Sequence, residues 1–393
     1  MRAVFRHFNQ ERIVFALTVL LLIVFACTLP NFLAPNNLLS LVRSVAVLGI
    51  LGLGMLVVVL GRGIDLSLVA TMAISVAWGL QLISGGMSVA AGMTLGLLFA
   101  LAMSLITGIL IAYAEIPSLF ATLAMATFIY GFGRAHLITG TDVVYLPADI
   151  GWIAGFGQGI LLGIPTPIVV ALVTGILVAY AEIPPLFATL AMATFVYGFG
   201  RAHLIVGTDV VYMPKTMGWI AQAGQGKLAG IPMPIIVAAV VALVVYLFLR
   251  FSKIGNFIFA IGDNPAAARI GGIAVRPMLV LQYGIAGVIT FVAGLITATS
   301  VEAMNTRIVN SNMIYDVILV VVLGGVGLSG GRGNVRNVIV GTLLIGVLMN
   351  GMTIMDIQFT VQNVIKSLIL LLAIVIDSVV NPRDEQTGQQ GDI

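Results

Sequence analysis

Long apolar runs, separated by short polar or glycine-containing segments, dominate this chain of 393 residues. A helix needs about 20 mainly apolar residues to cross the hydrocarbon core of a membrane, and its backbone groups must find their hydrogen bonds within the helix. The runs have about this length, and they lack the apolar/polar alternation of membrane β-strands. The sequence therefore predicts an all-α, polytopic membrane protein, and its content of only 8% charged residues agrees with this.

Twelve spans are expected from these runs. They are Ile13–Leu29, Ser44–Leu60, Leu66–Ile83, Ala91–Ala114, Leu119–Thr139, Pro165–Ala181, Leu186–Val206, Pro232–Leu249, Met278–Ser300, Tyr315–Leu328, Val338–Ile354 and Val361–Val380. Basic residues are retained on the cytoplasmic side of inner-membrane proteins, so Arg2, Arg6 and Arg12 place the N-terminus inside. An even number of spans then returns the C-terminus to the same side. We expect a multi-pass protein of the bacterial inner membrane with both termini in the cytoplasm.

A tandem duplication is the second strong feature. The 41-residue stretch from Thr107 to Pro147 recurs from Thr174 to Pro214, an offset of 174 − 107 = 67 residues. The five differing pairs are Ile111/Val178, Ser118/Pro185, Ile129/Val196, Thr139/Val206 and Leu146/Met213. Solenoid repeats share far fewer positions than this. We interpret residues 107–173 and 174–240 as a recent tandem repeat that adds a hairpin of two spans to a protein of ten.

The segment from Gly255 to Arg276 is the one sizeable polar element between spans. Asp263 or Asn264 can cap a helix, Pro265 suits its first position, and Gly271 with Gly272 can end it. This pattern predicts a short, rigid helix on the inner membrane face, within a cytoplasmic loop over residues 250–277. The alternatives are a contact element for a soluble partner and a simple connection between helices.

Two glycine-rich interruptions lie close to the membrane. The first is Gly61–Ser67, where Asp65 or Ser67 would cap the following helix, and it is either part of a translocation path or an interfacial turn. The second runs from Ser329 to Gly333 and is not a phosphate-binding loop, because no Lys-Ser/Thr pair follows. Our candidates for path-lining polar residues are Asp65, Ser67, Asp316 and Asn350.

Several classes of function lack support in the sequence. No motif for a catalytic residue set or a metal site is present, and the single cysteine, Cys27, gives neither a disulfide nor a thiolate cluster. We expect no cofactor and no nucleic-acid partner. No ladder of acidic residues crosses the spans, which argues against a proton- or sodium-driven carrier. The energy source must then lie on another chain.

These residues resemble the permease subunits of ribose/xylose/galactose-type ABC importers. The motifs that carry the resemblance are Asn31–Asn37 (NFLAPNN), Gly63–Ser67 (GIDLS), Ile183–Pro185 with Thr189–Leu190, Ala260–Ile273 (AIGDNPAAARIGGI), and Leu323–Gly325 with Leu328–Gly333. Together they extend over nearly the whole chain. Arg62 departs from the family pattern, because it replaces the first glycine of a GGIDLS-like signature. Ile314 stands where the family has a glutamate before Asp316.

The resemblance implies a type II importer-like arrangement of two permease subunits, as a homodimer or heterodimer in the lipid membrane. It also implies two cytoplasmic ATPase subunits and a periplasmic sugar-binding protein. The family's coupling segment corresponds here to Gly262, Asp263, Asn264, Pro265, Ala267, Arg269 and Gly272. We therefore predict the membrane-spanning subunit of an importer of a pentose or hexose, with ATP hydrolysis on a partner chain. The alternatives are an ion-driven secondary carrier and a non-functional paralogue disrupted by its extra hairpin.

Overall fold

The computed structural model of the chain describes residues 10–115, 118–132, 160–161, 164–165, 210–327 and 330–380. The chain divides into two units, the larger formed by residues 1–139 and 210–393 and the smaller by residues 140–209. The described residues of the smaller unit form one antiparallel strand pair, β1 (Ile160–Leu161) and β2 (Ile164–Pro165). All other elements belong to the larger unit.

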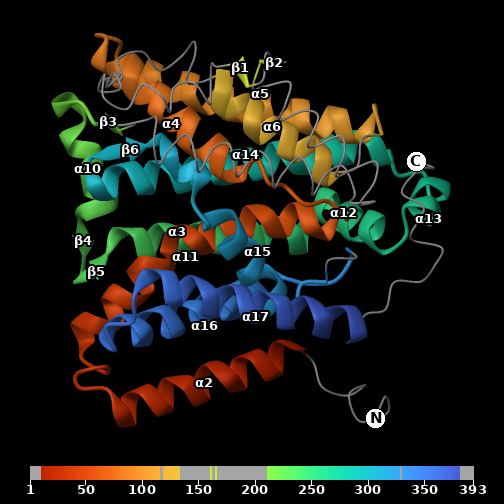
Figure 1. Cartoon of the computed structure of the whole chain (residues 1–393). Helices are drawn as coiled ribbons and strands as arrows, with labels where there is room; N and C mark the ends of the chain where they lie inside the picture. The colour runs from red at the N-terminus through yellow and green to blue at the C-terminus, as the bar shows by residue number, and fades with distance from the viewer. Residues whose placement is uncertain are drawn as a thin grey trace. The chain divides into compact units, whose positions relative to one another are not determined.

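The larger unit is a bundle whose long helices lie side by side (Figure 1). Its helices before the gap are α2 (Gln10–Thr28), α3 (Pro35–Leu60), α4 (Leu68–Ser84), α5 (Val89–Ala112) and α6 (Ser118–Phe132). After the gap come α10 (Gly218–Gln225), α11 (Met233–Phe251), α12 (Lys253–Asp263), α13 (Pro265–Ile270), α14 (Val275–Val301), α15 (Met313–Leu323), α16 (Val335–Ile354) and α17 (Phe359–Val380). In the described residues, α2, α3, α5, α11, α14 and α16 are long and apolar enough to cross a membrane.

The expected spans agree with these helices wherever the structure describes them. Ten of the expected spans overlap a helix, from Ile13–Leu29 with α2 to Val361–Val380 with α17, although Tyr315–Leu328 is helical only as far as Leu323. Residues 133–139 of the span Leu119–Thr139, residues 166–181 and the span Leu186–Val206 lie outside the described residues. The chain is therefore a polytopic helical membrane protein, as the apolar runs predicted.

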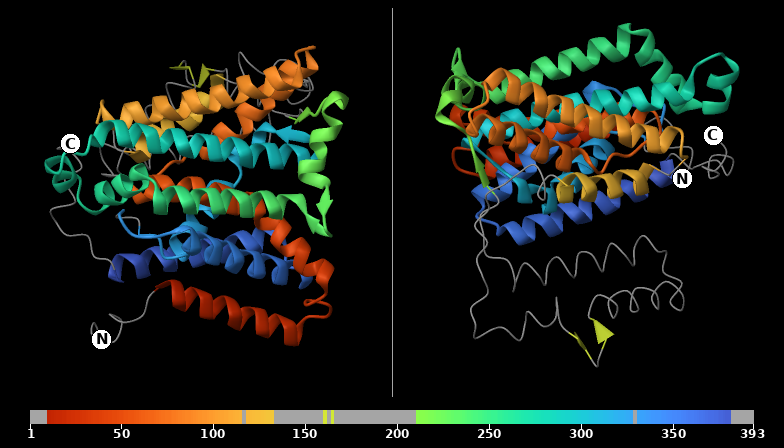
Figure 2. Two further views of the ribbon diagram at one scale, coloured as in Figure 1. Left: turned by 180° about the vertical axis from the view of Figure 1, so that it is seen from behind. Right: turned by 90° about the horizontal axis from the view of Figure 1, so that it is seen from above.

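Short elements gather at the two ends of the bundle. Helices α12 and α13 lie at one end, and at the other lie α10, the 3₁₀ helix Lys215–Met217 and the strands β3 (Val210–Tyr212), β4 (Lys227–Leu228) and β5 (Ile231–Pro232) (Figure 1). The view from behind in Figure 2 shows the same separation. β3 pairs antiparallel with β6 (Ala303–Asn305), and β4 pairs with β5. These strand pairs are short connections, which the expectation of an all-helical chain had not included.

Small residues set the closest helix contacts. Helix α5 packs along α14, where a Cβ on Gly108 would meet the backbone of Val280 and one on Gly287 would meet Ser104. Lipid tails are as apolar as leucine, so helices in a membrane associate through such close packing. Helix α3 is the most buried of the long helices, whereas α2 and α11 are largely exposed.

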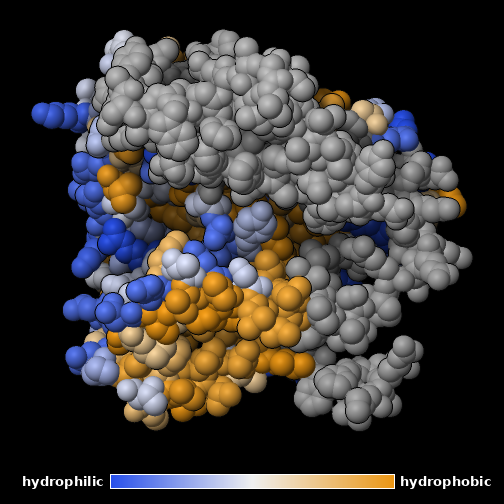
Figure 3. All heavy atoms as spheres, in the orientation of Figure 1, coloured by the Kyte–Doolittle hydropathy of each residue, from blue (hydrophilic) through white to orange (hydrophobic). Residues whose placement is uncertain are grey.

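The outward faces of the bundle are apolar. Figure 3 shows an apolar surface over the region of α2, α16 and α17, with hydrophilic atoms at the end where α10 and β4 lie. The exposed apolar side chains include Leu20 and Ile23 of α2, Leu243 of α11, and Val364 and Leu368 of α17. Such faces suit contact with lipid rather than water.

The duplication is visible in the strand pairs. β1–β2 pairs Ile160 with Pro165, and β4–β5 pairs Lys227 with Pro232, at the same 67-residue offset as the sequence repeat. From the first copy the larger unit contains the end of α5 and α6, and from the second copy it contains β3 through the start of α11. The bundle therefore draws on one half of each copy.

A chain lacking residues 140–206, which joins Thr139 to Gly207, is expected to keep the bundle intact. The deletion removes one repeat length and leaves 393 − 67 = 326 residues. Ile129 and Met213, on either side of the gap, already lie in one hydrophobic cluster, so a short connection suffices. We expect an unchanged thermal unfolding midpoint in detergent. Deletion of residues 140–212, which also removes β3, should lower the midpoint, and equal effects of the two deletions would contradict this division of the repeat.

Candidate functional site

The polar segment after α11 forms two consecutive short helices. Ser252 caps α12 by accepting a hydrogen bond from the Gly255 N–H at 2.9 Å, and Asn264 caps α13 by accepting one from the Ala267 N–H at 3.0 Å. Pro265 occupies the first turn of α13, and Gly271 ends it. Gly272 follows with a φ of +83°, a left-handed conformation that favours glycine. The capped helix expected here is present, and α12 extends the element toward α11.

One face of this α12–α13 segment is anchored and the other is free. Ile258 and Ile261 of α12 and Ala268 of α13 are buried in the bundle. Ala267 is exposed, and Ile270 is 89% exposed. An apolar side chain held in the open on a capped, anchored helix is suited to contact another protein.

The first glycine break contains a fully buried polar turn. Asp65 and Ser67 are both 0% exposed, and the Asp65 Oδ1 atom accepts hydrogen bonds from Ser67 N at 2.8 Å and Ser67 Oγ at 2.6 Å. Asp65 therefore stabilises the turn before α4, and the Ser67 side chain makes no cap bond. The Ile64 N–H donates to Ser118 Oγ at 3.3 Å, so the first copy of the repeat supports the break.

Three segments far apart in the sequence meet at the end of α3. Arg62 Nε donates to the Gly262 carbonyl at 2.9 Å, and Arg62 Nη2 donates to the Asp263 carbonyl at 2.7 Å. The Gly331 N–H of the second glycine-rich interruption donates to the Leu60 carbonyl at 2.9 Å. We call this contact among residues 60–63, 262–263 and 330–331 the glycine junction. It connects the end of α12 to both glycine breaks.

Glycine is required where the backbones cross in the junction. A Cβ on Gly262 would collide with the Leu60 carbonyl and the Gly331 N–H, which are backbone groups that cannot rotate away. Arg62 has a φ of +68°, a left-handed conformation that is strained for a residue with a side chain. Glycine, which the family resemblance implies at this position, would adopt this conformation without strain. Partial burial lowers the pKa of the Arg62 guanidinium, and the nearby Asp263 carboxylate opposes the shift.

Substitutions of Arg62 are expected to lower the free energy of unfolding by different amounts, depending on whether the strained backbone conformation remains. Arg62→Met loses both bonds to the α12 carbonyls and keeps the strained φ, so we expect a loss of about 2 kcal/mol in the free energy of unfolding. Arg62→Gly loses the same bonds but relieves a strain of about 1–3 kcal/mol, so it should lie between wild type and Arg62→Met. Denaturant titrations in detergent measure this order. A glycine variant less stable than the methionine variant would contradict it.

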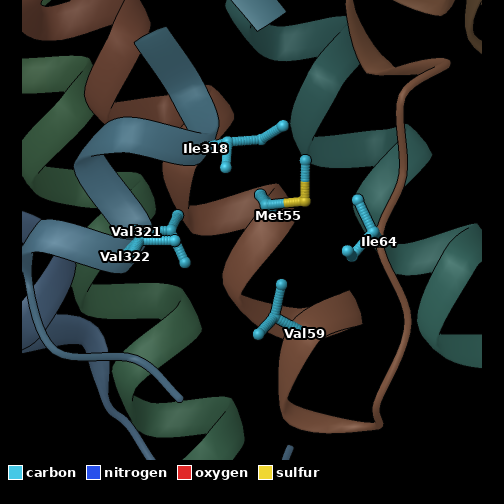
Figure 4. Close-up of a pocket in the computed structure, with 6 residues that line it drawn as sticks. All are labelled: Met55, Val59, Ile64, Ile318, Val321 and Val322. Atoms are coloured by element: carbon cyan, nitrogen blue, oxygen red, sulfur yellow. The ribbon is translucent and has the colours of Figure 1, made fainter. Parts of the chain in front are cut away.

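An apolar contact lies beside the first break. Met55 and Val59 of α3, Ile64 of the break, and Ile318, Val321 and Val322 of α15 surround a void of about 10 Å³ (Figure 4). A pocket of this size is at the lower limit for one water, and its lining offers no polar partner.

A different face of α15 carries polar groups toward α17. Lys366 Nζ lies 2.8 Å from Asp316 Oδ2, with side-chain exposures of 5% and 18%. Asp316 is in the first turn of α15, where a carboxylate also interacts favourably with the helix dipole. Lys366 was missed in the sequence analysis, although a lone lysine within the apolar run Val361–Val380 is itself a signal of a buried partner.

The four predicted path residues therefore occupy three places. Asp65 and Ser67 lie together in the first break, and Asp316 lies between α15 and α17. Asn350 exchanges two side-chain hydrogen bonds with Asn37, at 3.0 and 3.1 Å, between α16 and the start of α3. Within the described ranges, no three of the His, Cys, Asp and Glu side chains are grouped so as to hold a metal ion.

The predicted coupling residues lie together, as continuous sequence requires. Gly262 is buried in the glycine junction, whereas Asp263, Asn264, Ala267, Arg269 and Gly272 are exposed at the same end of the bundle. Pro265 is partly buried. Arg62 and Gly331 are the junction residues that the sequence analysis did not assign to this site.

Comparisons with known proteins place these features in context. The family model described as branched-chain amino acid transport system / permease component matches residues 151–376. The ribose import permease protein RbsC of Escherichia coli strain K12 is 24% identical over 369 residues, 94% of each chain. RbsC of Bacillus subtilis is 28% identical over 91% of this chain and 89% of its own length.

A further relative is named for a different sugar. The xylose transport system permease protein XylH of Haemophilus influenzae is 29% identical over 92% of this chain and 94% of its own length. No solved structure matches the chain.

Proposed function

This chain belongs to the branched-chain amino acid transport system / permease component family, and on that premise we propose that it is the membrane-spanning permease subunit of an ATP-driven importer of a simple sugar. Relatives named for ribose and xylose support a pentose as the cargo, and relatives named for galactofuranose and galactose support a hexose. ATP is hydrolysed on a separate subunit, and a periplasmic sugar-binding protein delivers the substrate. Two copies of the permease, or this chain and a related one, form the path in the inner membrane.

The α12–α13 segment is the observation that carries this proposal. Its free face, with Ala267 and Ile270, receives the ATPase from the cytoplasm. Its buried end at Gly262 and Asp263 is bonded to Arg62 of the first break, and Leu60 of that region is bonded to Gly331 of the second. A displacement of α12 by the ATPase therefore acts directly on both helix breaks. The glycine junction is the mechanical link from ATP hydrolysis to the spans.

The basic residues support the proposed orientation. Arg62, Arg276 and Arg336 lie at the end of the bundle that carries α12 and α13, where Arg276 pairs with Glu115 at 2.6 Å and Arg336 with Glu11 at 2.6 Å. Under the positive-inside rule this is the cytoplasmic end. Helix α2 begins at Gln10, and its Glu11 pairs with Arg336, so the start of α2 lies at this same end of the bundle. This position supports a cytoplasmic N-terminus.

Ala267→Arg is expected to abolish coupling without unfolding the protein. Ala267 is exposed and arginine is a good helix former, so the fold tolerates the change. A bulky cation on the free face should nevertheless block a fitted ATPase groove, lowering ATP-dependent sugar uptake by about tenfold or more. The measurement is uptake of radiolabelled ribose, xylose or galactose into proteoliposomes that contain the permease, its ATPase and its binding protein. Lys227→Ala, at the opposite end, is the control.

Two other outcomes would replace the proposal. Uptake by the purified chain alone under a proton or sodium gradient would identify an ion-driven carrier. Absent uptake in the complete system, restored by deletion of residues 140–206, would identify a paralogue that its duplication inactivates. Full uptake by Ala267→Arg would remove the coupling role of this face.

A further inference from the structure

We propose that the cleft between α15 and α17 is a binding site for a neutral monosaccharide, an inference that rests on the proposed function and adds a substrate site to it. The cleft has a volume of about 230 Å³. Its polar lining consists of Asn312, just before α15, Tyr315 and Asp316 from α15, and Asn363, Lys366 and Ser367 from α17. Pockets for drug-sized ligands begin at about 300 Å³, so this cleft suits a smaller molecule.

The ion pair sets the charge of the site. Lys366 and Asp316 are joined at 2.8 Å and are almost enclosed, so the cleft contains one cation and one anion and carries no net charge. A charged pair is costly to place within a membrane span, and ionisable residues there mark sites of ligand or ion passage. Since the two charges already satisfy each other, neither is free to hold an ionic ligand. The electrostatics favour a neutral, polar molecule.

Asn363 supplies an unfilled hydrogen-bond position. Its Oδ1 atom is buried and has no hydrogen-bond partner among the described residues. A buried acceptor without a donor costs about 1–3 kcal/mol, so the missing donor is expected from a ligand. Asn363 and the Lys366 ammonium group line the same cleft. Among the described residues, one of the three Lys366 N–H donors binds Asp316 Oδ2, and the ammonium also lies 5.9 Å from the centre of the Phe359 ring.

A sugar hydroxyl meets both requirements at once. It donates one hydrogen bond, to Asn363 Oδ1, and accepts others, from Lys366 Nζ. Tyr315 is half exposed at the cleft and presents a ring against which the C–H face of a sugar can pack. An aliphatic amino acid offers no hydroxyl groups, and its two charges would have to split the existing ion pair. The chemistry of the cleft therefore selects a polyol.

The test uses a single reactive thiol in the full-length chain in lipid nanodiscs. Cys27 is exposed and is replaced by serine, and Ser367→Cys places a thiol on the cleft lining. D-ribose, D-xylose, D-galactose and L-leucine are then tested for slowing of maleimide alkylation. We expect at least one sugar to slow the reaction and leucine not to. Lys227→Cys, exposed on β4 and outside the cleft lining, is the control, and its alkylation should be unaffected by the sugars.

The variant Asn363→Leu distinguishes a sugar-binding role of the cleft from a purely structural role. Removing an unpartnered buried oxygen leaves the unfolding midpoint unchanged or raises it, yet sugar protection should weaken about five- to tenfold, the value of one hydrogen bond. If Asn363→Leu does not fold, Tyr315→Ala, which removes the half-exposed ring from the cleft lining and leaves the Ser367→Cys reporter in place, carries the same test. Absence of protection by every sugar, or protection by leucine alone, overturns the proposal.

ATP-driven uptake distinguishes this inference from the function on which it rests. If wild type transports a sugar that gives no protection, and Asn363→Leu transports it equally well, the cleft site is wrong and the permease function stands. If the complete importer transports no sugar although sugars protect the thiol, the site stands and the transport function is wrong.

Discussion

Gly262→Val is expected to abolish transport and to lower the free energy of unfolding by about 3 kcal/mol. Any side chain at this position enters the space of the Leu60 carbonyl and the Gly331 N–H. Both are backbone groups, so the strain can be relieved only by separating the three segments of the glycine junction. That separation breaks the Gly331 N–H to Leu60 carbonyl bond and displaces the two carbonyls that Arg62 binds. The substitution therefore lowers the stability of the fold and also breaks the contact through which α12 would act on the two helix breaks.

Gly271→Ala is the matched control for this substitution. Gly271 lies nine residues later (271 − 262 = 9) in the same polar segment, has a φ of −71°, and a Cβ there would find nothing closer than 3.4 Å. We expect wild-type stability and uptake from it. Chemical denaturation in detergent and ATP-dependent uptake measure both variants. A Gly262→Val protein with near-normal uptake would show that the junction is not the link between ATPase and spans.

The helices of this protein could be predicted from its sequence because of the membrane itself. A span in lipid must satisfy its own backbone hydrogen bonds, so a sufficiently long apolar run has few other conformations open to it. The boundaries of the capped helix α13 could also be predicted from the sequence. Asn264, Pro265 and Gly271 were expected to delimit a helix and do so, since each acts through backbone geometry within a few residues.

The glycine junction could not be predicted in the same way. Its bonds connect residues 200 and 201 positions apart, from Arg62 to Gly262 and Asp263. The two breaks and the α12–α13 segment were each identified, but no local signal states that they touch. Arg62 conceals its role further, because the conformation it adopts favours glycine and the sequence shows only an arginine.

The polar cleft was missed for a related reason. Asp316 was identified as a path candidate, but the acidic residues were judged without their cations, and Lys366 was not considered. An ion pair 50 residues apart needs the packing of α15 on α17 before it can be recognised. The role of Ser118 in the repeat was also not visible in the sequence. Ser118 accepts a hydrogen bond from the Ile64 N–H of the first break, whereas Pro185, at the same position of the second copy, has no side-chain oxygen that could accept it.

Lys366→Met is expected to lower the free energy of unfolding by about 3–5 kcal/mol, because it leaves the Asp316 carboxylate without its cation in an enclosed site. The double variant Asp316→Leu/Lys366→Met removes both ions, and we expect it to recover most of this loss. Val364→Ala, on the lipid-exposed face of α17, should change stability little. Denaturant titration of the three proteins gives the ranking. A Lys366→Met protein as stable as the double variant would mean that Asp316 is neutral or hydrated without lysine.

The double variant also separates stability from ligand recognition. It restores a packed contact between α15 and α17 while removing the Lys366 ammonium group that would donate to a sugar hydroxyl. A cleft that serves only to join two helices would let this variant transport normally once it folds. We instead expect a stable protein in which sugars no longer protect the thiol introduced by Ser367→Cys and sugar uptake is reduced. If the double variant regains stability but not uptake, the ion pair serves in substrate binding and not only in stabilising the fold.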